Sequence, residues 1–233
     1  MKYDFLNIIG LMTGTSVDGI DISLVQTNGL NLKRLNKNYF YKYSEETKSF
    51  LMEMLNEDIN INLKRKQYLD EFITNEHYLA LKDLDIIQMA DIIGFHGQTI
   101  FHNSEQKISK QLGDGKLMSQ LVKKKIIYNF RQEDMINKGQ GAPLTPIFHN
   151  LLSKKINENH QIDFPICFLN IGGISNITKI IKKDEKLEEN LEAFDSGPGN
   201  CMIDEWVRKN SKNNFDESGS IAKSGKINQL ILN

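Results

Sequence analysis

A stretch near the start of the sequence, GLMTGTSVDGID (residues 10–21), combines residue types that could hold a phosphate group. Gly14 and Gly19 can adopt positive φ angles, which lets backbone N–H groups converge on an anion. The hydroxyl donors beside them are Thr13, Thr15 and Ser16. Asp18 and Asp21 would repel a phosphate, so they predict a Mg²⁺ ion between carboxylate and phosphate. The alternative is an ordinary glycine-rich turn whose Asp and Ser side chains only bond to the turn's own backbone.

Polar residues also follow two apolar stretches in the middle of the chain. ADIIGFHGQTIFH (90–102) predicts one short buried strand that ends in polar residues, and IIYNF (126–130) predicts another, followed by charges and glycines. Sites in open α/β sheets form at the carboxyl ends of strands. The residues that we expect to face a ligand there are His96, Gln98, Thr99, His102, Arg131, Asp134 and Gln140. A surface loop without a role is the alternative for the segment after residue 130.

Two further glycine-rich segments lie in the last third of the chain. NIGGISN (170–176) predicts a second hairpin, with its turn at Gly172 and Gly173. FDSGPGNCMIDEW (194–206) predicts a strand, a tight turn and a helix, near whose start backbone N–H groups would point at an anion. Two polar-tipped hairpins far apart in sequence suit an enzyme that grips ATP phosphates between two related domains.

The remaining elements must position these residues. Apolar strands before and after residues 10–21 predict a β-hairpin. Residues 44–57 and 65–83 show helical periodicity and are expected to cover a sheet, with Ser44 as an N-cap and His77 on a helix surface. A helix with proline in its first turn is expected after the GQGAP segment (139–143).

Composition narrows the class of protein. The 233 residues are 39% hydrophobic and carry a net charge of -1, with no basic patch that would predict binding to nucleic acid or to a membrane surface. No apolar run is long enough for a membrane span, and the N-terminus has no signal-peptide pattern, so we expect a cytoplasmic protein. Cys167 and Cys201 are interpreted as buried free thiols.

Six motifs together closely resemble the anhydro-N-acetylmuramic acid kinase family. In chain order they are GLMTGTSVDGID, GFHGQTIFH, QLGDG, NFRQEDMINKGQGAPLTPIFH, NIGGISNIT and FDSGPGNCMIDEW. The resemblance implies an α/β actin-like ATPase or sugar-kinase fold, which is ribonuclease H-like, with a first domain over residues 1–161 and an incomplete second domain over residues 162–233. Because family members continue well beyond this point, the chain is identified as a C-terminally truncated member. Its second part is expected to hold three strands and a helix, and its sheet is expected to lack helical cover, which would leave an open edge and apolar surface exposed.

The resemblance also implies an activity. Such kinases use ATP, Mg²⁺ and water to convert 1,6-anhydro-N-acetylmuramic acid into N-acetylmuramic acid 6-phosphate during peptidoglycan recycling, and the family suggests a homodimer. The implied ATP-phosphate contacts are Gly14, Thr15, Ser16, Val17, Asp18, Gly19, Ile20, Asp21, Gly172 and Gly173, with Asp18 holding the metal through water. The implied contacts to the sugar are His96, Gln98, Arg131 and Gln140.

Two residues depart from the family pattern. The family has an aspartate, the expected water-activating base, directly before the FR dipeptide, where this chain has Asn129. An amide cannot accept a proton at neutral pH. Lys138 stands where the family has a second glycine before GQGAP. A catalytically inactive remnant of such a kinase is therefore the alternative, and a kinase for another sugar is a third reading.

Overall fold

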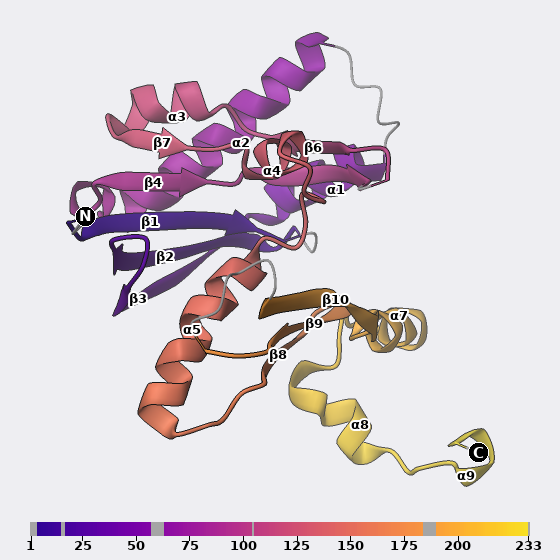
Figure 1. Ribbon diagram of the computed structural model, residues 1–233. Coiled ribbons are helices and arrows are strands. Elements are labelled where there is room, and N and C mark those ends of the chain that lie inside the picture. Colours follow the sequence, from indigo (N-terminus) through magenta and orange to yellow (C-terminus); the bar gives the residue numbers. More distant parts are fainter. Residues whose placement is uncertain (1–3, 15–16, 57–62, 104, 184–189, 233) are drawn as a thin grey trace. The chain divides into compact units, whose positions relative to one another are not determined.

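The computed structural model describes residues 4–14, 17–56, 63–103, 105–183 and 190–232 (Figure 1). Internal contacts divide the chain into two compact units, Met1–Leu144 and Thr145–Asn233. Both units combine sheets with helices, which confirms the α/β class. None of the described helices has the length and apolar character needed to cross a bilayer.

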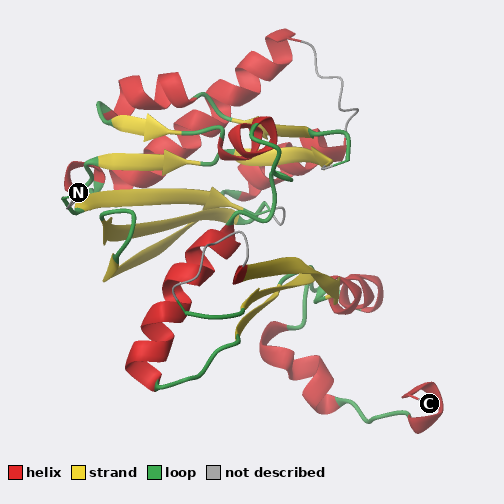
Figure 2. Ribbon diagram, viewed as in Figure 1, coloured by secondary structure: helices red, strands yellow, loops and turns green. Residues whose placement is uncertain are grey.

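The first unit is built on a mixed five-stranded sheet with the order β3-β2-β1-β4-β7 (Figure 2). Its strands are β1 (Leu6–Thr13), β2 (Gly19–Thr27), β3 (Leu32–Lys42), β4 (Ile92–Phe95) and β7 (Lys125–Ile127). β1, β2 and β3 form an antiparallel meander, whereas β4 is parallel to β1 and β7 is parallel to β4. The predicted hairpin around residues 10–21 is confirmed, and β3 is an additional strand that the sequence interpretation did not include.

Side-chain alternation along β1 and β2 gives the sheet one buried face and one exposed face. Ile9, Leu11 and Ile20 are buried in the core, while Met12 and Asp21, which lie opposite each other in the ladder, are exposed. The period of two therefore assigns the chemistry-bearing Asp21 to the open face and its apolar neighbours to the core.

Helices cover the buried face. These are α1 (Glu45–Asn56), α2 (Leu63–Asp83) and α3 (Gly115–Val122), and their buried residues join those of β1, β2 and β4 in one cluster. Ser44 caps α1 as expected, because its hydroxyl accepts the Thr47 N–H at 3.0 Å. The surface position expected for His77 is wrong: this side chain is 0% exposed and packs edge-on against Phe95, with 4.9 Å between ring centroids.

The predicted strand over residues 90–102 is two strands rather than one. β4 ends at Phe95, and β5 (Gln98–Asn103) pairs with β6 (Ile108–Leu112) in a separate two-stranded sheet. The chain turns between them at Gly97, whose φ of 70° a glycine adopts without strain. A Cβ atom there would also lie 2.2 Å from the Leu112 carbonyl oxygen. Both the φ angle and the lack of space therefore require glycine at this position.

The second unit contains a three-stranded antiparallel sheet with the order β10-β9-β8. Its strands are β8 (Ile166–Ile171), β9 (Ile174–Ile180) and β10 (Leu191–Pro198). The predicted second hairpin and the strand after it are confirmed. The described helices of this unit are α5 (Thr145–His160), α7 (Cys201–Asn210), α8 (Ser220–Ser224) and α9 (Gln229–Leu232), with the short 3₁₀ turn η2 (Glu217–Gly219), so the expectation of one helix was too low.

Helix α5 covers one face of this sheet and groups with the second unit. His149 stacks on Phe168 and shares a hydrogen bond of 2.9 Å with the Thr178 hydroxyl. The sequence interpretation assigned this helix to a first domain that ends at residue 161, whereas the compact units divide at residue 144. The expected start with proline in the first turn is confirmed, because Pro146 is the second residue of α5.

The other face of the three-stranded sheet is apolar and exposed. Leu169, Ile177 and Phe194 form a cross-strand row on it, and the outer two are 59% and 55% exposed. Exposed apolar surface is therefore present as expected, but the expectation that the sheet lacks helical cover is wrong, because α5 packs on its opposite face. Cys167 is exposed and Cys201 is partly exposed, so the thiols are free as predicted but not buried.

Candidate functional site

The predicted site residues of the first unit follow the carboxyl ends of three neighbouring parallel strands. β1 leads into Gly14, β4 leads into His96, and β7 leads into Asn129 and Arg131. The pairs β1–β4 and β4–β7 are parallel, so these three ends lie at one edge of the sheet. This is the edge at which open α/β sheets bind ligands.

Two hydrogen bonds join the hairpin to the turn that follows β4. The Thr13 hydroxyl donates to the Gly97 carbonyl at 2.8 Å, and the Gln98 side-chain amide donates to the Gly14 carbonyl at 3.2 Å. Thr13 and Gln98 are both buried. Their donors therefore hold the protein together at this edge and are not directed at a ligand.

The hairpin loop divides its residues between core and surface. The side chains of Val17 and Ile20 are fully buried in the hydrophobic core, which leaves only their backbone for a ligand. Gly19 has no room for a side chain, since a Cβ atom would lie 2.4 Å from the Tyr41 carbonyl oxygen of β3. Thr15 and Ser16, predicted as phosphate contacts, lie outside the described residues.

Two exposed carboxylates, Asp18 and Asp21, border this loop and influence each other. Partial burial, and after it the negative charge of Asp18, raise the pKa of Asp21 above its ordinary value. A cation between the two would relieve this repulsion, so the pair fits Mg²⁺. Within the described ranges, no group of three or more His, Cys, Asp or Glu side chains could hold a metal.

His96 and Arg131 are joined to each other and to the neighbouring backbone by hydrogen bonds at this edge. The Arg131 Nε–H donates to His96 Nε2 at 2.9 Å, and a second Arg131 N–H donates to the Gly141 carbonyl at 2.9 Å. Because an arginine only donates, His96 Nε2 must be the acceptor, and the Nδ1–H then donates to the Gly97 carbonyl at 2.8 Å. Burial, followed by the charge of Arg131, lowers the pKa of His96, which keeps the imidazole neutral.

The GQGAP segment is fixed to the same arginine helix. The Asp134 carboxylate accepts the Gly141 N–H at 2.7 Å, so both Arg131 and Asp134 hold Gly141. Both residues lie on α4 (Phe130–Ile136). Gln140, in contrast, is exposed. Of the residues predicted in this segment, Gln140 thus keeps a side chain at the surface.

The two residues that depart from the family pattern both adopt left-handed backbone. Asn129 has a φ of 60° and precedes α4 as its N-cap, without a side-chain capping bond. β7 ends at Ile127, three residues before the end of the strand predicted over residues 126–130. The Asn129 side chain is exposed. Lys138 has a φ of 73°, a conformation that glycine adopts without strain.

In the second unit, the turn at Gly172 and Gly173 is tied to the start of α7. The Gly173 carbonyl accepts the N–H groups of Gly199 and Cys201, and the Gly172 carbonyl accepts the Asn200 N–H at 2.7 Å. The N–H groups predicted to point at an anion here therefore donate to backbone carbonyls. These bonds fix the turn to the N-terminus of α7.

Sequence reasoning missed Tyr43, which supports the hairpin from behind. Its N–H donates to the Asp18 carbonyl at 3.0 Å, and its side chain is 2% exposed. Burial, and then the charges of Glu76 and Asp18, raise the pKa of its phenol. Nothing in the sequence distinguishes this residue except its position directly before the Ser44 cap.

The family comparison and the curated relatives give the same family. The model of the family described as anhydro-N-acetylmuramic acid kinase matches residues 6–233. Curated proteins of that name from Pelagibacter ubique (strain HTCC1062) and Gluconobacter oxydans (strain 621H) are 46% and 34% identical, over 98% and 96% of this chain. The chain spans 61% and 62% of their lengths. A solved exopolyphosphatase-like protein superposes with a TM-score of 0.43 at 9% identity, covering 87% of this chain and 54% of that one, which is too weak a likeness to bear on the fold.

Proposed function

Because the chain belongs to the anhydro-N-acetylmuramic acid kinase family, we propose that it provides the phosphate-binding and sugar-binding edge of such a kinase. The reaction proposed for it takes 1,6-anhydro-N-acetylmuramic acid, ATP and water to N-acetylmuramic acid 6-phosphate and ADP in peptidoglycan recycling. Water adds to C1 and opens the anhydro bridge, while the freed O6 takes the γ-phosphoryl group. We also propose a cytoplasmic location, a homodimer and an actin-like arrangement of two domains.

One observation carries this proposal: the convergence of the glycine-rich hairpin, His96 and Arg131 at the carboxyl ends of three adjacent parallel strands. A phosphoryl transfer enzyme needs mainly positioning and charge neutralisation. In this proposal the backbone N–H groups of the hairpin position the phosphates, and the guanidinium of Arg131 neutralises their charge.

The acids of the hairpin have a distinct role in the proposal. Asp18, through water, and Asp21 would hold Mg²⁺, whose charge neutralises phosphate oxygens when it is bound. The two neighbouring carboxylates, whose negative charges repel, favour a cation here. Gly172 and Gly173 of the second unit would contact phosphate through the backbone of their turn, which is hydrogen-bonded to the start of α7.

On the sugar side, His96 would act as a fixed neutral group and Gln140 as an exposed polar contact. Gln98 is fully buried, and its side-chain oxygen has no hydrogen-bond partner within the described residues. We assign it to holding Gly14 in place, and through that bond to the phosphate hairpin rather than to the sugar.

A second candidate function, nucleotide binding with impaired catalysis, is favoured by Asn129. Its exposed side chain stands where the resemblance predicts the base that deprotonates water. A carboxamide has no basic lone pair for that step at neutral pH. The two functions agree on binding and differ in turnover.

Transfer of labelled γ-phosphate from Mg-ATP to the anhydro sugar tests the proposal directly. Labelled sugar 6-phosphate that depends on Asp18 supports the kinase function. Nucleotide binding without labelled sugar supports the impaired member. Absence of both nucleotide binding and transfer, from a chain that is folded by circular dichroism, would sink both functions.

A further inference from the structure

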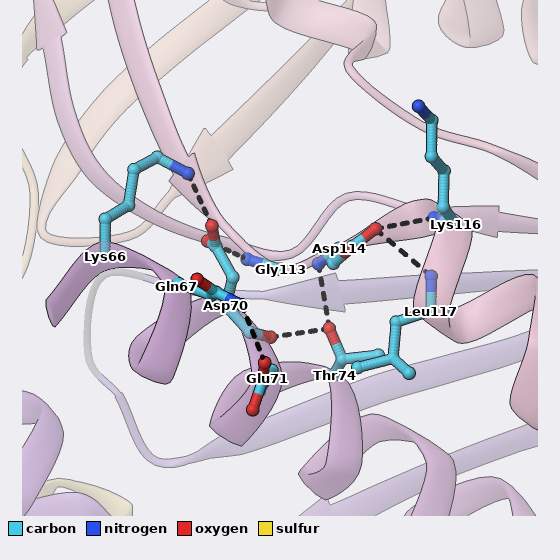
Figure 3. Close-up of polar contacts among 9 residues, drawn as sticks. All are labelled: Lys66, Gln67, Asp70, Glu71, Thr74, Gly113, Asp114, Lys116 and Leu117. Carbon is cyan, nitrogen blue, oxygen red and sulfur yellow. Dashed lines mark hydrogen bonds and ion pairs between the residues drawn. The ribbon is translucent and has the colours of Figure 1, made fainter. Parts of the chain in front are cut away.

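The QLGDG motif (111–115) forms a turn that is held by helix α2, as Figure 3 shows. The Asp70 carboxylate accepts the Gly113 N–H at 2.9 Å, and the Thr74 hydroxyl accepts the Asp114 N–H at 2.8 Å. Thr74 also donates to the Asp70 carbonyl at 2.6 Å, which orients its hydroxyl. Two consecutive N–H groups of the turn are therefore bonded to two side chains one helical turn apart on α2.

The Gly113–Asp114 turn packs tightly against Phe95 and Gly97 at the end of β4. A Cβ atom on Gly113 would lie 2.6 Å from the Phe95 ring and 3.6 Å from the Gly97 Cα atom. Gly97 in turn lies so close to Leu112 that a Cβ atom would meet its carbonyl oxygen at 2.2 Å. The backbone of residues 112–113 thus sets where residues 95–97 can lie.

Residues 95–97 carry the groups that define the candidate site. The Gly97 carbonyl accepts both the Thr13 hydroxyl and the His96 Nδ1–H, each at 2.8 Å. His96 Nε2 accepts the Arg131 Nε–H on its other side. A shift of the Gly113–Asp114 turn would therefore reach the hairpin and the His96–Arg131 pair through direct contacts.

We propose that Asp70 and Thr74 are positioning residues, which fix His96 and Gly97 at the ligand edge by holding the Gly113–Asp114 turn. This rests on the proposed function only in treating that edge as the place where ligand binds. It gives the QLGDG motif a role. Gly113 supplies the close approach to Phe95, while Asp114 donates its N–H to the Thr74 hydroxyl and caps α3 with its own carboxylate.

The Asp70 carboxylate makes an ion pair with Lys66 and a hydrogen bond with the Gly113 N–H, and the two differ in how exposed they are. Lys66, 48% exposed, pairs with it at 2.5 Å near the surface, where an ion pair contributes little. The Asp70 side chain itself is only 15% exposed, and Thr74 is 0% exposed. Loss of either acceptor would leave a turn N–H unpaired in a shielded place, which is the costlier change.

The test uses NMR signals of the site and does not require kinase activity. Thr74→Val is nearly isosteric and replaces the hydroxyl with a methyl group, whereas Thr74→Ser keeps a hydroxyl. In the same way, Asp70→Ala removes the side-chain acceptor of residue 70, whereas Asp70→Asn keeps an acceptor oxygen. The readouts are the His96 ring signals and the hydrogen-exchange rate of the Arg131 Nε–H proton, at one fixed pH. Glu71→Ala, on the same helix and exposed, is the control.

We expect Thr74→Val and Asp70→Ala to shift the His96 signals and to speed exchange at Arg131 Nε by roughly threefold to tenfold, as for the weakening of one hydrogen bond. Thr74→Ser and Asp70→Asn should restore the original values, because both keep an acceptor. Unchanged signals in folded Thr74→Val, with lower stability alone, would show a merely structural role and overturn the proposal. If Asp70→Ala fails to fold, the comparison of Thr74→Val with Thr74→Ser tests the proposal by itself.

A thermal shift with Mg-ATP keeps this result separate from the proposed function. Altered His96 signals in a chain that never binds nucleotide would support the positioning role and count against the kinase function. Normal nucleotide binding by all variants, with unaltered His96 signals, would overturn the positioning role and support the proposed nucleotide-binding function.

Discussion

Arg131 donates its Nε–H to His96 Nε2 at 2.9 Å, and this one bond determines which imidazole nitrogen carries the proton. The proton is left on Nδ1, and this N–H donates a hydrogen bond to the Gly97 carbonyl. A histidine held in this way cannot act as a base through Nε2 while Arg131 stays in place. The pair is therefore a fixed polar group at the edge of the sheet, in which burial first, and then the charge of Arg131, lower the pKa of His96 and keep its imidazole neutral.

Replacing Arg131 should make His96 easier to protonate. The charge of Arg131 is the second cause of the lowered His96 pKa, after burial. Arg131→Met should therefore raise that pKa toward its ordinary value, as measured by NMR titration of the ring. Arg131→Lys keeps the charge but cannot reproduce the two directed bonds, so it should raise the pKa less while still releasing Gly141. An unchanged His96 titration in Arg131→Met would contradict the geometry described.

Binding of Mg-ATP should depend on Asp18. We expect millimolar Mg-ATP to raise the melting temperature of the chain, because a ligand that binds only the native state stabilises it. Asp18→Ala should abolish the shift. Glu53→Ala, an exposed acid on α1, should leave it unchanged. A shift that survives in Asp18→Ala would place the nucleotide away from this hairpin.

Regular patterns in the sequence predicted much of this fold. The period-two alternation around residues 6–27 specified the hairpin, and paired glycines marked the turn at residues 172–173. β3 was missed because its sequence, LKRLNKNYFYK, is dominated by polar and charged residues that suit an edge strand but not a buried one.

Contacts between distant residues could not be predicted in the same way. His77 looks like a surface residue in a charged helix, and only the position of Phe95 explains its burial. Asp70 and Thr74 contact residues 43 and 40 positions further along the chain. No local pattern encodes such a contact, so the candidate site could be located at strand ends but its supporting network could not.

Buried His77 should make the chain less stable in mild acid. Burial lowers its pKa to about 4 from 6.5, and the charge of nearby His96 acts in the same direction. Between these values the unfolded chain binds a proton that the folded chain excludes, so stability is full above pH 6.5 and falls as the pH drops toward 4. At about 1.36 kcal/mol per pH unit, going from pH 6.5 to 5 costs up to about 2 kcal/mol.

Urea denaturation at both pH values measures this loss. His77→Phe should flatten the slope because it removes the titrating group and keeps a ring against Phe95. His160→Phe, at the exposed end of α5, is the control. An equal acid slope in His77→Phe and the unmodified chain would rule out His77 as the cause.

Lys138→Gly should stabilise the first unit. Lys138 has a φ of 73°, and left-handed backbone costs an L-residue roughly 1–2 kcal/mol. Part of that gain is offset by the greater entropy of glycine in the unfolded chain, which leaves about 0.5–1 kcal/mol. The melting temperature should rise by roughly 2–4 °C. The same substitution at Lys82, in the last turn of helix α2, should lower it instead. A lower melting temperature for Lys138→Gly would show that the lysine side chain contributes more than its backbone costs.

Asn129 allows the sharpest test of the chemistry. A base that takes a proton in the transition state contributes about 10²–10⁴-fold, or roughly 3–5 kcal/mol of barrier. The 233 residues span 61% of the Pelagibacter ubique relative, so the test joins them to the remaining part of that relative. A chimera that adds the following part of the Pelagibacter ubique relative should bind nucleotide but turn over slowly. Asn129→Asp in that chimera should then raise turnover by the general-base factor.

The control for this experiment is Asn36→Asp, which makes the same chemical change at an exposed asparagine with the same left-handed backbone, φ of 52°, in β3. It should leave turnover unaltered, so that any gain at residue 129 reflects position rather than added charge. The assay is transfer from labelled ATP to the anhydro sugar at several pH values, since a carboxylate base also adds an acidic limb to the pH profile. If the chimera with Asn129 is as fast as the chimera with aspartate, residue 129 does not occupy the base's position. The water would then have to be activated elsewhere at the edge formed by β1, β4 and β7.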